Sequence, residues 1–288
     1  MMRALELFSG LGGWRLALGG RGEVAAAYDV NEAANATYTL NHGESPKASE
    51  LATIPASELA SHRADTWLLS PPCQPFCRMG NHQGLDDRRS RAFRHLMDLF
   101  PELPPDGLVL ENVGGFLGSD AHALLAERLR VHGLHRLDLA ACPSRFGLPN
   151  QRPRVFVVAS RRPLEARPLP DLPLRRIAEF LDDVEDERLY LPEPILARHR
   201  HGLDLVAAED RRSTCFIGGY GQRYVASGSF LRTTRGVRRF STAEVARLLG
   251  LPEGFRFPAH VPLEARYKLL GNGLSIPVAA WALSHLDG

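Results

Sequence analysis

Cys73 is the residue whose surroundings in this sequence most clearly predict chemistry. It stands in the run Ser70-Pro71-Pro72-Cys73-Gln74, where two prolines fix the backbone directly before the thiol. Neither proline suits a helix or a central strand, so we expect a rigid loop that presents one sulfur atom. A cysteine that only fills a core needs no such frame. Cys73 is therefore a candidate nucleophile, whereas Cys77, which lacks the frame, is expected to pack.

Glu111 and two arginines are candidates for proton transfer and charge stabilisation. Glu111-Asn112-Val113 follows an apolar run, and a carboxyl group at a strand end in an enclosed pocket can keep a proton near neutrality. Gln151-Arg152-Pro153-Arg154 precedes another apolar run, so two guanidinium groups can point into the same crevice. Each has an ordinary interpretation too: Glu111 as a helix cap or surface acid, and the arginines as solvent-exposed bases.

A glycine-rich turn near the amino terminus is typical of a ligand-binding loop. Phe8-Ser9-Gly10-Leu11-Gly12-Gly13 lies between a predicted strand and a predicted helix. Glycines there let the backbone approach a ligand, and the helix amino terminus offers N–H groups. Asp29 ends the next predicted strand, where a carboxylate can accept both hydroxyls of a ribose. Together they favour a nucleotide-like ligand, with a plain turn and a helix cap as the alternatives.

The elements that must position these residues alternate between strands and helices. Short apolar runs predict strands at residues 4–8, 24–28, 66–69, 107–110 and 154–159. Helices are expected at residues 14–18, 32–40, 242–249 (with Ser241 as its cap) and 276–286. The alternation predicts an α/β fold with a doubly wound, mostly parallel sheet, whose ligands bind at the carboxyl ends of its strands.

Composition and charge bound the organisation of this 288-residue chain. After Ser160 the sequence becomes rich in proline, arginine and acidic residues and less periodic. This change predicts a small second domain over residues 166–264 and a main domain of residues 1–165 and 265–288. Residues 151–240 contain 17 arginines and 12 acids, a net charge of +5 against −3 for the rest. An arginine-rich face suits phosphate contact. A general preference for arginine over lysine would explain the same numbers, since the chain has just two lysines.

Several protein classes are disfavoured. The chain is 44% hydrophobic and 24% charged, as in ordinary globular proteins, and no apolar run approaches the roughly 20 residues of a membrane span. Its start lacks the pattern of a secretory signal, so a cytoplasmic location is expected. Four cysteines are too few for a disulfide scaffold. No metal is expected, because Cys73 and Cys77 have no second Cys or His pair to complete a zinc site.

Taken in order, these motifs resemble those of the cytosine-5 methyltransferase family. Gly271-Asn272 adds a further match, and Arg239 to Phe255 is similar to the family's remaining long motif. The resemblance covers almost the whole chain. It implies a class I S-adenosylmethionine methyltransferase fold with a smaller target-recognition domain, S-adenosyl-L-methionine as the cofactor, and nucleic acid as the partner.

The resemblance also implies a role for each matched residue. Cys73 would add to C6 of cytosine, Glu111 would bind and protonate N3, and Arg154 with Arg152 would stabilise charge at O2. The implied catalytic residues are Cys73, Glu111, Arg152 and Arg154. The implied cofactor-binding residues are Phe8, Ser9, Gly10, Gly12, Gly13, Asp29, Glu50, Pro72 and Asn272. Glu50 stands where the family often has aspartate.

Within the family, the chain is most similar to the branch that methylates the anticodon loop of aspartate-type tRNA. Pro72 to Phe76 with Arg78, and Cys215-Phe216 followed by Gly219-Tyr220-Gly221, carry this resemblance. The implied substrate-binding residues are Gln74, Arg78, Cys215, Phe216 and Tyr220.

The chain departs from this branch at three positions. Cys77 and Ile217 stand where threonine is usual, and Gly273 stands where serine is usual. Ile217 leaves the substrate preference open, because it lies in the branch's signature in the small domain. A DNA cytosine-5 methyltransferase of a restriction–modification system is the alternative. A binding-only protein is disfavoured, since the three residues of the reaction occur together.

Overall fold

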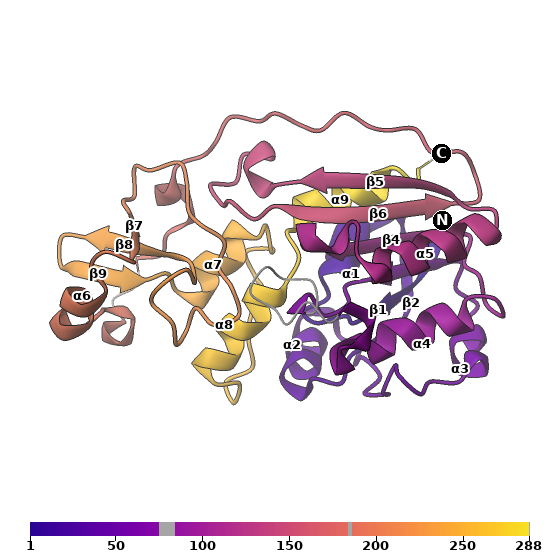
Figure 1. The fold of residues 1–288 in the computed structure, drawn as a ribbon. Helices are drawn as coiled ribbons and strands as arrows, with labels where there is room; N and C mark the ends of the chain where they lie inside the picture. The colour runs from indigo at the N-terminus through magenta and orange to yellow at the C-terminus, as the bar shows by residue number, and fades with distance from the viewer. Residues whose placement is uncertain (75–83, 184–185, 288) are drawn as a thin grey trace. The chain divides into compact units, whose positions relative to one another are not determined.

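The computed structural model describes residues 1–74, 84–183 and 186–287 (Figure 1). The chain forms two compact units, each described by itself. The first unit contains Met1–Ala141, Pro153–Pro168 and Ala279–Gly288; the second contains Cys142–Arg152 and Leu169–Val278. The domain boundaries expected from the sequence stay a prediction.

The first unit is built on a six-stranded sheet with the strand order β2-β1-β3-β4-β6-β5. Its strands are β1 (Met2–Leu7), β2 (Gly22–Tyr28), β3 (Thr66–Leu69), β4 (Gly107–Asn112), β5 (His135–Ala141) and β6 (Arg154–Ser160). Neighbouring strands among β1 to β4 pair in parallel, while β6 is antiparallel to both β4 and β5. The prediction of a mostly parallel α/β sheet is confirmed.

The reversed direction of β6 was not foreseen and affects the site. Arg154 is the first residue of β6, so it lies at an amino end rather than a carboxyl end. Because β6 runs against β4, this amino end lies at the sheet edge where β4 finishes, with Asn112 opposite Val155. Glu111 and Asn112 continue the pairing, so β4 extends two residues beyond the predicted strand.

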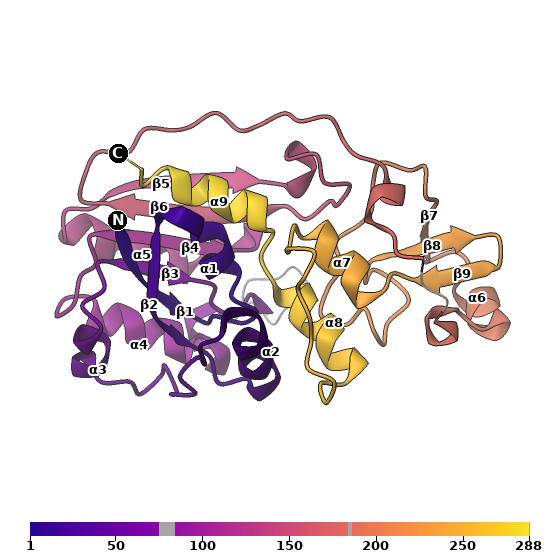
Figure 2. The ribbon, with the colours of Figure 1, turned by 180° about the vertical axis from the view of Figure 1, so that it is seen from behind.

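Helices cover both faces of this sheet, as Figures 1 and 2 show. The helices of the unit are α1 (Gly13–Leu18), α2 (Glu32–His42), α3 (Ala56–Ser61), α4 (Arg91–Leu99), α5 (Asp120–Val131) and the later part of α9 (Ile276–Ser284). On one face, α4 and α5 bury Phe93, Leu96 and Leu125 in the main apolar core. On the other face Trp14 of α1 packs edge-on against Phe156 of β6. Apolar burial on both faces explains the near-continuous apolar strands.

The second unit contains a small sheet with the order β7-β8-β9. Its elements are β7 (Asp204–Val206), β8 (Ser229–Thr233), β9 (Gly236–Arg239), α6 (Glu193–His199), α7 (Thr242–Leu248) and α8 (Leu263–Asn272). The predicted cap is confirmed, since Ser241 Oγ accepts the Glu244 N–H and the Glu244 carboxylate accepts the Ser241 N–H. Glu244 also forms a buried ion pair with Arg238 (2.7 Å).

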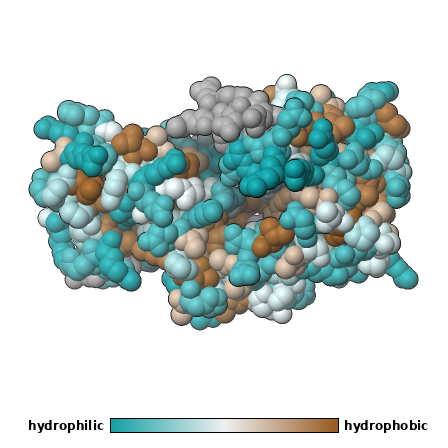
Figure 3. Space-filling view, turned by 60° about the horizontal axis from the view of Figure 1, so that its bottom comes forward, coloured by the Kyte–Doolittle hydropathy of each residue, from teal (hydrophilic) through white to brown (hydrophobic). Residues whose placement is uncertain are grey.

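The surface is mostly hydrophilic, as the composition of an ordinary globular protein predicts. Figure 3 shows hydrophilic side chains over most of one face, with hydrophobic residues in small separate groups. Across the described ranges, the structure contains no helix that is both long and apolar enough to cross a membrane.

Candidate active site

The glycine-rich turn after β1 has an unusual backbone. Phe8, Gly10 and Gly12 all have positive φ angles (61°, 52° and 80°), a backbone conformation that residues other than glycine rarely adopt. The turn is held to β2 because the Ser9 N–H donates to the Tyr28 carbonyl (2.9 Å) and the Gly10 N–H to Asp29 Oδ2 (2.9 Å). Strain at Phe8 is typical of a backbone shaped for a ligand.

Gly12 is fixed by close packing as well as by its backbone angle. A Cβ atom at this position would overlap the His42 imidazole and come within 2.9 Å of the Tyr38 ring. Both side chains belong to α2, so the missing side chain lets the turn lie directly against this helix.

Glu6 supports the turn from β1, a role that was not predicted from the sequence. It is fully buried in β1, where Oε1 accepts the N–H groups of Trp14 (3.0 Å) and Arg15 (3.3 Å) and Oε2 accepts the Tyr38 hydroxyl (2.9 Å). Gly12 has no side chain to cap α1, so Glu6 takes over the cap from the neighbouring strand. Burial raises the pKa of Glu6 to about 7. An acid inside an apolar strand was the available signal.

Asp29 lies where the sequence placed it, directly after β2. Its carboxylate accepts the N–H groups of Gly10 (2.9 Å) and Asn31 (2.8 Å). Burial raises the pKa of Asp29, and these two hydrogen bonds oppose that shift. Asp29 therefore links the glycine-rich turn to the start of α2, with Asn31 as the helix cap.

The turn fits a polar ligand with hydrogen-bonding groups. Among the described residues, the buried Ser9 hydroxyl has no hydrogen-bond partner. A buried polar group without a partner is unfavourable, and a bound molecule would supply one. The expected nucleotide-like cofactor therefore suits Ser9, the open glycine backbone and Asp29. The part of the chain that the structure describes contains no cluster of three residues able to hold a metal ion.

The loop that carries Cys73 is held from two sides. The Ser70 N–H donates to the Leu7 carbonyl (3.3 Å), and Ser70 Oγ accepts the Trp14 indole N–H (2.9 Å). On the other side, the Asn112 amide donates to the Pro71 carbonyl (3.2 Å). Cys73 forms no disulfide and is partly exposed. The predicted rigid loop thus has fixed backbone contacts, and Asn112, buried at the end of β4, contributes one that was not predicted from the sequence.

Glu111 and Arg154 form an ion pair at the same edge of the sheet. Arg154 Nε lies 3.1 Å from Glu111 Oε1, and their side chains are 17% and 11% exposed. Arg154 also donates to the Pro153 carbonyl (2.8 Å). Because β3, β4 and β6 are neighbours in the sheet, the Cys73 loop, Glu111 and Arg154 come from consecutive strands. The ordinary interpretation of these two as isolated surface charges does not hold.

Arg152 has a different environment from Arg154. It is buried in the second unit, where its guanidinium donates to the carbonyls of Phe216 (3.1 Å), Gly271 (2.9 Å) and Gly273 (2.7 Å) and to Cys215 Sγ (3.3 Å). These contacts tie the Cys215-Phe216 segment to the end of α8. A direct role in the reaction stays a prediction, while the geometry favours a positioning role.

Phe216 and Tyr220, predicted to bind substrate, are core residues of the second unit. Their exposed fractions are 2% and 0%. The Tyr220 hydroxyl donates to the Ser229 carbonyl (2.7 Å) and accepts the Phe240 N–H (2.9 Å). Both residues therefore have a packing role, and their contact with the substrate stays a prediction. Cys215 is partly exposed and is held by Arg152.

The remaining predicted residues are placed as follows. Gly13 begins α1, Pro72 and Gln74 flank Cys73 and are partly exposed, and Glu50 is exposed in the loop before α3. Asn272 ends α8 and is exposed, in the second unit. The predicted positions Arg78 and Cys77 lie outside the described residues. The cofactor and substrate roles of these residues stay predictions.

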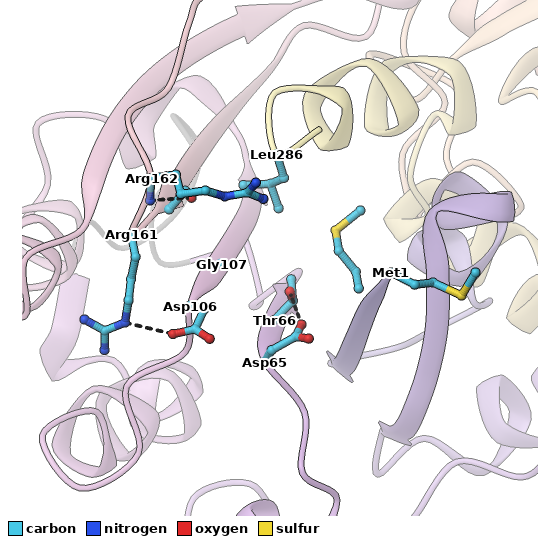
Figure 4. Close-up of a pocket in the computed structure, with 10 residues that line it drawn as sticks. Met1, Asp65, Thr66, Asp106, Gly107, Arg161, Arg162 and Leu286 are labelled. Carbon is cyan, nitrogen blue, oxygen red and sulfur yellow. Dashed lines mark hydrogen bonds and ion pairs between the residues drawn. The ribbon is translucent and has the colours of Figure 1, made fainter. Parts of the chain in front are cut away.

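A cavity of about 420 Å³ lies at the opposite edge of the sheet. It is bordered by residues that precede β3 and β4 or follow β6, among them Asp65, Asp106 and Arg161 (Figure 4). Arg161 Nε donates to Asp106 Oδ1 (2.8 Å). None of the predicted site residues lines this cavity, so it is separate from the candidate active site.

The fold and the arrangement of these side chains are those of an α/β methyltransferase. The chain matches the family of C-5 cytosine-specific DNA methylases over residues 2–198 and 205–286, and it belongs to that family. The protein is therefore a C-5 cytosine methyltransferase, and membership implies the use of S-adenosylmethionine.

Individual relatives support the predicted branch. The chain is 30% identical to the tRNA (cytosine(38)-C(5))-methyltransferase of Schizosaccharomyces pombe, over 99% of this chain and 96% of that protein. It is 29% identical to the enzyme of the same name from Homo sapiens, over 97% of each. The solved structure of the Entamoeba histolytica methyltransferase EhMeth superimposes with a TM-score of 0.94 at 26% identity, covering 99% of this chain and 98% of that one. The resemblance to this branch is confirmed.

Proposed function

We propose that this enzyme transfers a methyl group from S-adenosyl-L-methionine to carbon 5 of a cytosine in the anticodon loop of a tRNA, through a covalent bond to Cys73. The observation that carries the chemistry is the origin of Cys73, Glu111 and Arg154 from three neighbouring strands at one sheet edge. The tRNA substrate is supported by the full-length relatives that bear tRNA methyltransferase names.

The three residues divide the reaction between them. Carbon 5 of cytosine is a poor nucleophile until electrons are supplied to the ring. The Cys73 thiolate forms a bond to C6, the C5–C6 double-bond electrons shift into the C4–C5 bond, and the N3–C4 double-bond electrons take up a proton from Glu111 at N3, which leaves C5 electron-rich. Arg154 stabilises the charge that develops at O2. After C5 has received the methyl group, water takes the C5 proton, the electrons of that C–H bond re-form the C5–C6 double bond and expel the Cys73 thiolate, and N3 returns its proton to Glu111.

The glycine-rich turn and its neighbours would hold the cofactor. When bound, S-adenosylmethionine supplies a methyl group attached to a positively charged sulfur. Asp29 would accept hydrogen bonds from the ribose, the partnerless Ser9 hydroxyl would bind a polar group, and Phe8 would pack against the molecule. Asp29 and the turn share a hydrogen bond, so they form one preorganised surface.

An anticodon-loop cytosine suits this chemistry because it is already unpaired. A base inside a duplex must be flipped out before a side chain can reach C6, which requires a few kcal/mol. A loop base avoids most of that energy and can be recognised on its exposed edges.

A second candidate substrate is DNA. The family model that matches the chain is that of a DNA methylase, and a DNA enzyme would use the same catalytic residues. The two candidates differ in the polymer that carries the cytosine, so the substrate must be tested directly.

The test uses the purified protein with labelled S-adenosylmethionine and either bulk unmodified tRNA or unmethylated DNA. We expect label in tRNA, in a product that sequencing locates in the anticodon loop. Label mainly in DNA would contradict the tRNA proposal and support the second candidate. Label in neither polymer would contradict both.

A further inference from the structure

Three exposed arginines lie on two segments of the second unit that contact each other. Arg198 and Arg200 lie at the carboxyl end of α6, and Arg223 lies in the loop between residues 219 and 227. All three side chains belong to residues exposed to solvent. Figures 1 and 2 show α6 beside the small sheet of the same unit. We call these three residues the arginine patch.

An aromatic stack joins the two segments. The His199 ring stacks on the Tyr224 ring with centroids 5.1 Å apart and an angle of 21°, and Tyr224 stacks on the fully buried Phe230 (6.4 Å, 24°). Next to the stack, a Cβ at Gly202 would lie 2.7 Å from a methyl group of Val225, so the backbones approach closely. His199 is the neighbour of Arg198 and Arg200, and Tyr224 is the neighbour of Arg223. The stack therefore anchors all three arginines to the core.

The backbone around Arg223 is also fixed. Its N–H donates to the Gly219 carbonyl (2.8 Å), and its carbonyl accepts the Ser227 hydroxyl (3.1 Å). The aliphatic part of the Arg223 side chain passes over Gly219, where a Cβ would come within 3.0 Å of Cδ. The position of the side chain is thus restricted at its base, while the residue stays exposed.

The charges of the arginine patch have no acidic partner among the described residues, unlike those of Arg176 and Arg188 in the same unit. Arg176 and Arg188 each form an ion pair with an acid, Glu209 (2.7 Å) and Asp186 (2.8 Å) respectively. Within the described residues, none of the three patch arginines forms an ion pair. The segments 197–203 and 219–227 contain no aspartate or glutamate at all. The patch therefore presents uncompensated positive charge on a rigid base.

We propose that the arginine patch binds the phosphate backbone of the RNA substrate. Guanidinium groups bind phosphate oxygens with two parallel hydrogen bonds, and the absence of a protein carboxylate leaves these donors available for phosphate. Contacts of this kind fix the orientation of a nucleic acid without reading its sequence. The inference rests on the proposed function, since it assigns a binding surface for the tRNA.

The test compares the protein with the triple variant R198A/R200A/R223A. Binding of unmodified bulk tRNA is measured at several salt concentrations, and methylation is measured at saturating tRNA. We expect tRNA affinity to fall roughly tenfold to a hundredfold and the salt dependence, as the slope of log K against log salt, to decrease by about two to three. The kcat at saturating tRNA and the KM for S-adenosylmethionine should stay unchanged, because the patch is not part of the candidate active site.

A matched control is the variant R130A/R176A/R188A, which removes three exposed arginines that each have an acidic partner. We expect its tRNA affinity to change less than about twofold, since those charges are already compensated. The variant R198K/R200K/R223K should keep the salt slope, because lysine keeps the charge, but should lose part of the affinity, because lysine cannot form the two parallel hydrogen bonds.

Two results would overturn the inference: equal losses in the patch and control variants, or an unchanged salt slope in the patch variant. Loss of binding to an acidic polypeptide with unchanged tRNA binding would also overturn it and assign the patch to a protein partner. Failure of the proposed function has a different signature, because the unaltered protein would then methylate no tRNA.

Discussion

Cys73 and Cys77 are four positions apart, yet Cys73 alone directly follows two prolines. We expect C73A to lose at least about 10³-fold in turnover, because alanine cannot form the bond to C6 that the proposed reaction requires. C77S should retain most of the activity. Single-turnover methylation of tRNA measures both variants, and circular dichroism checks their folding. Equal losses in both variants would mean that the nucleophile has been misassigned.

Glu111 is the residue for which charge and hydrogen bonding can be separated. In E111Q the amide can still contact the cytosine edge but cannot give a proton to N3, so kcat should fall on the order of 10²-fold. Arg154 would lose its 3.1 Å ionic partner at the same time. E127Q, which alters an exposed acid paired with Arg130, is the control and should keep full activity. A normal kcat in E111Q would exclude proton transfer by Glu111.

A single added methyl group, in the variant G12A, tests whether the shape of the glycine-rich turn is needed for cofactor binding. G12A places a Cβ at a φ of 80°, against His42 and Tyr38, and strain of this kind costs about 1–3 kcal/mol. We expect the dissociation constant for S-adenosylmethionine, measured by calorimetry, to rise at least about tenfold. G20A is the matched control, because a Cβ there meets no atom within 4 Å in the described structure. Normal cofactor binding by G12A would show that the turn does not hold the cofactor.

The elements show where reasoning from the sequence succeeds. β3 was predicted at both of its ends because it is a fully buried apolar run, and the cap of α7 was predicted from Ser241 and Glu244. β5 was missed because charged residues alternate along it, as in an edge strand with one solvated face. The reversed direction of β6 could not be predicted either, since its apolar sequence is compatible with both directions.

The same limit applies to the site. Cys73, Glu111 and Arg154 were found because their local sequence is unusual. Arg152 and Tyr220 belong to equally distinctive motifs, but their partners include a backbone carbonyl and a core ring far away in the sequence. The role of Glu6 was missed for a related reason, since its hydrogen-bond donors Trp14 and Tyr38 belong to two helices that follow it in the chain. A sequence motif identifies a residue, whereas burial and tertiary contacts determine what it touches.

For the whole molecule, Glu6 predicts how stability depends on pH. Its pKa is raised from 4.5 to about 7, so between these values the folded protein binds a proton that the unfolded chain has released. Stability from this group is therefore full below pH 4.5 and is lost as pH rises to about 7, by roughly 3 kcal/mol in total. In E6Q the amide oxygen can still accept the Trp14 and Arg15 N–H groups, and position 6 no longer titrates. The free energy of unfolding of the unaltered protein minus that of E6Q, measured by urea denaturation, should fall across this window and then stay level. Other titrating groups cancel in this difference, so a constant value from pH 4.5 to 7.5 would show that Glu6 does not take up the proton.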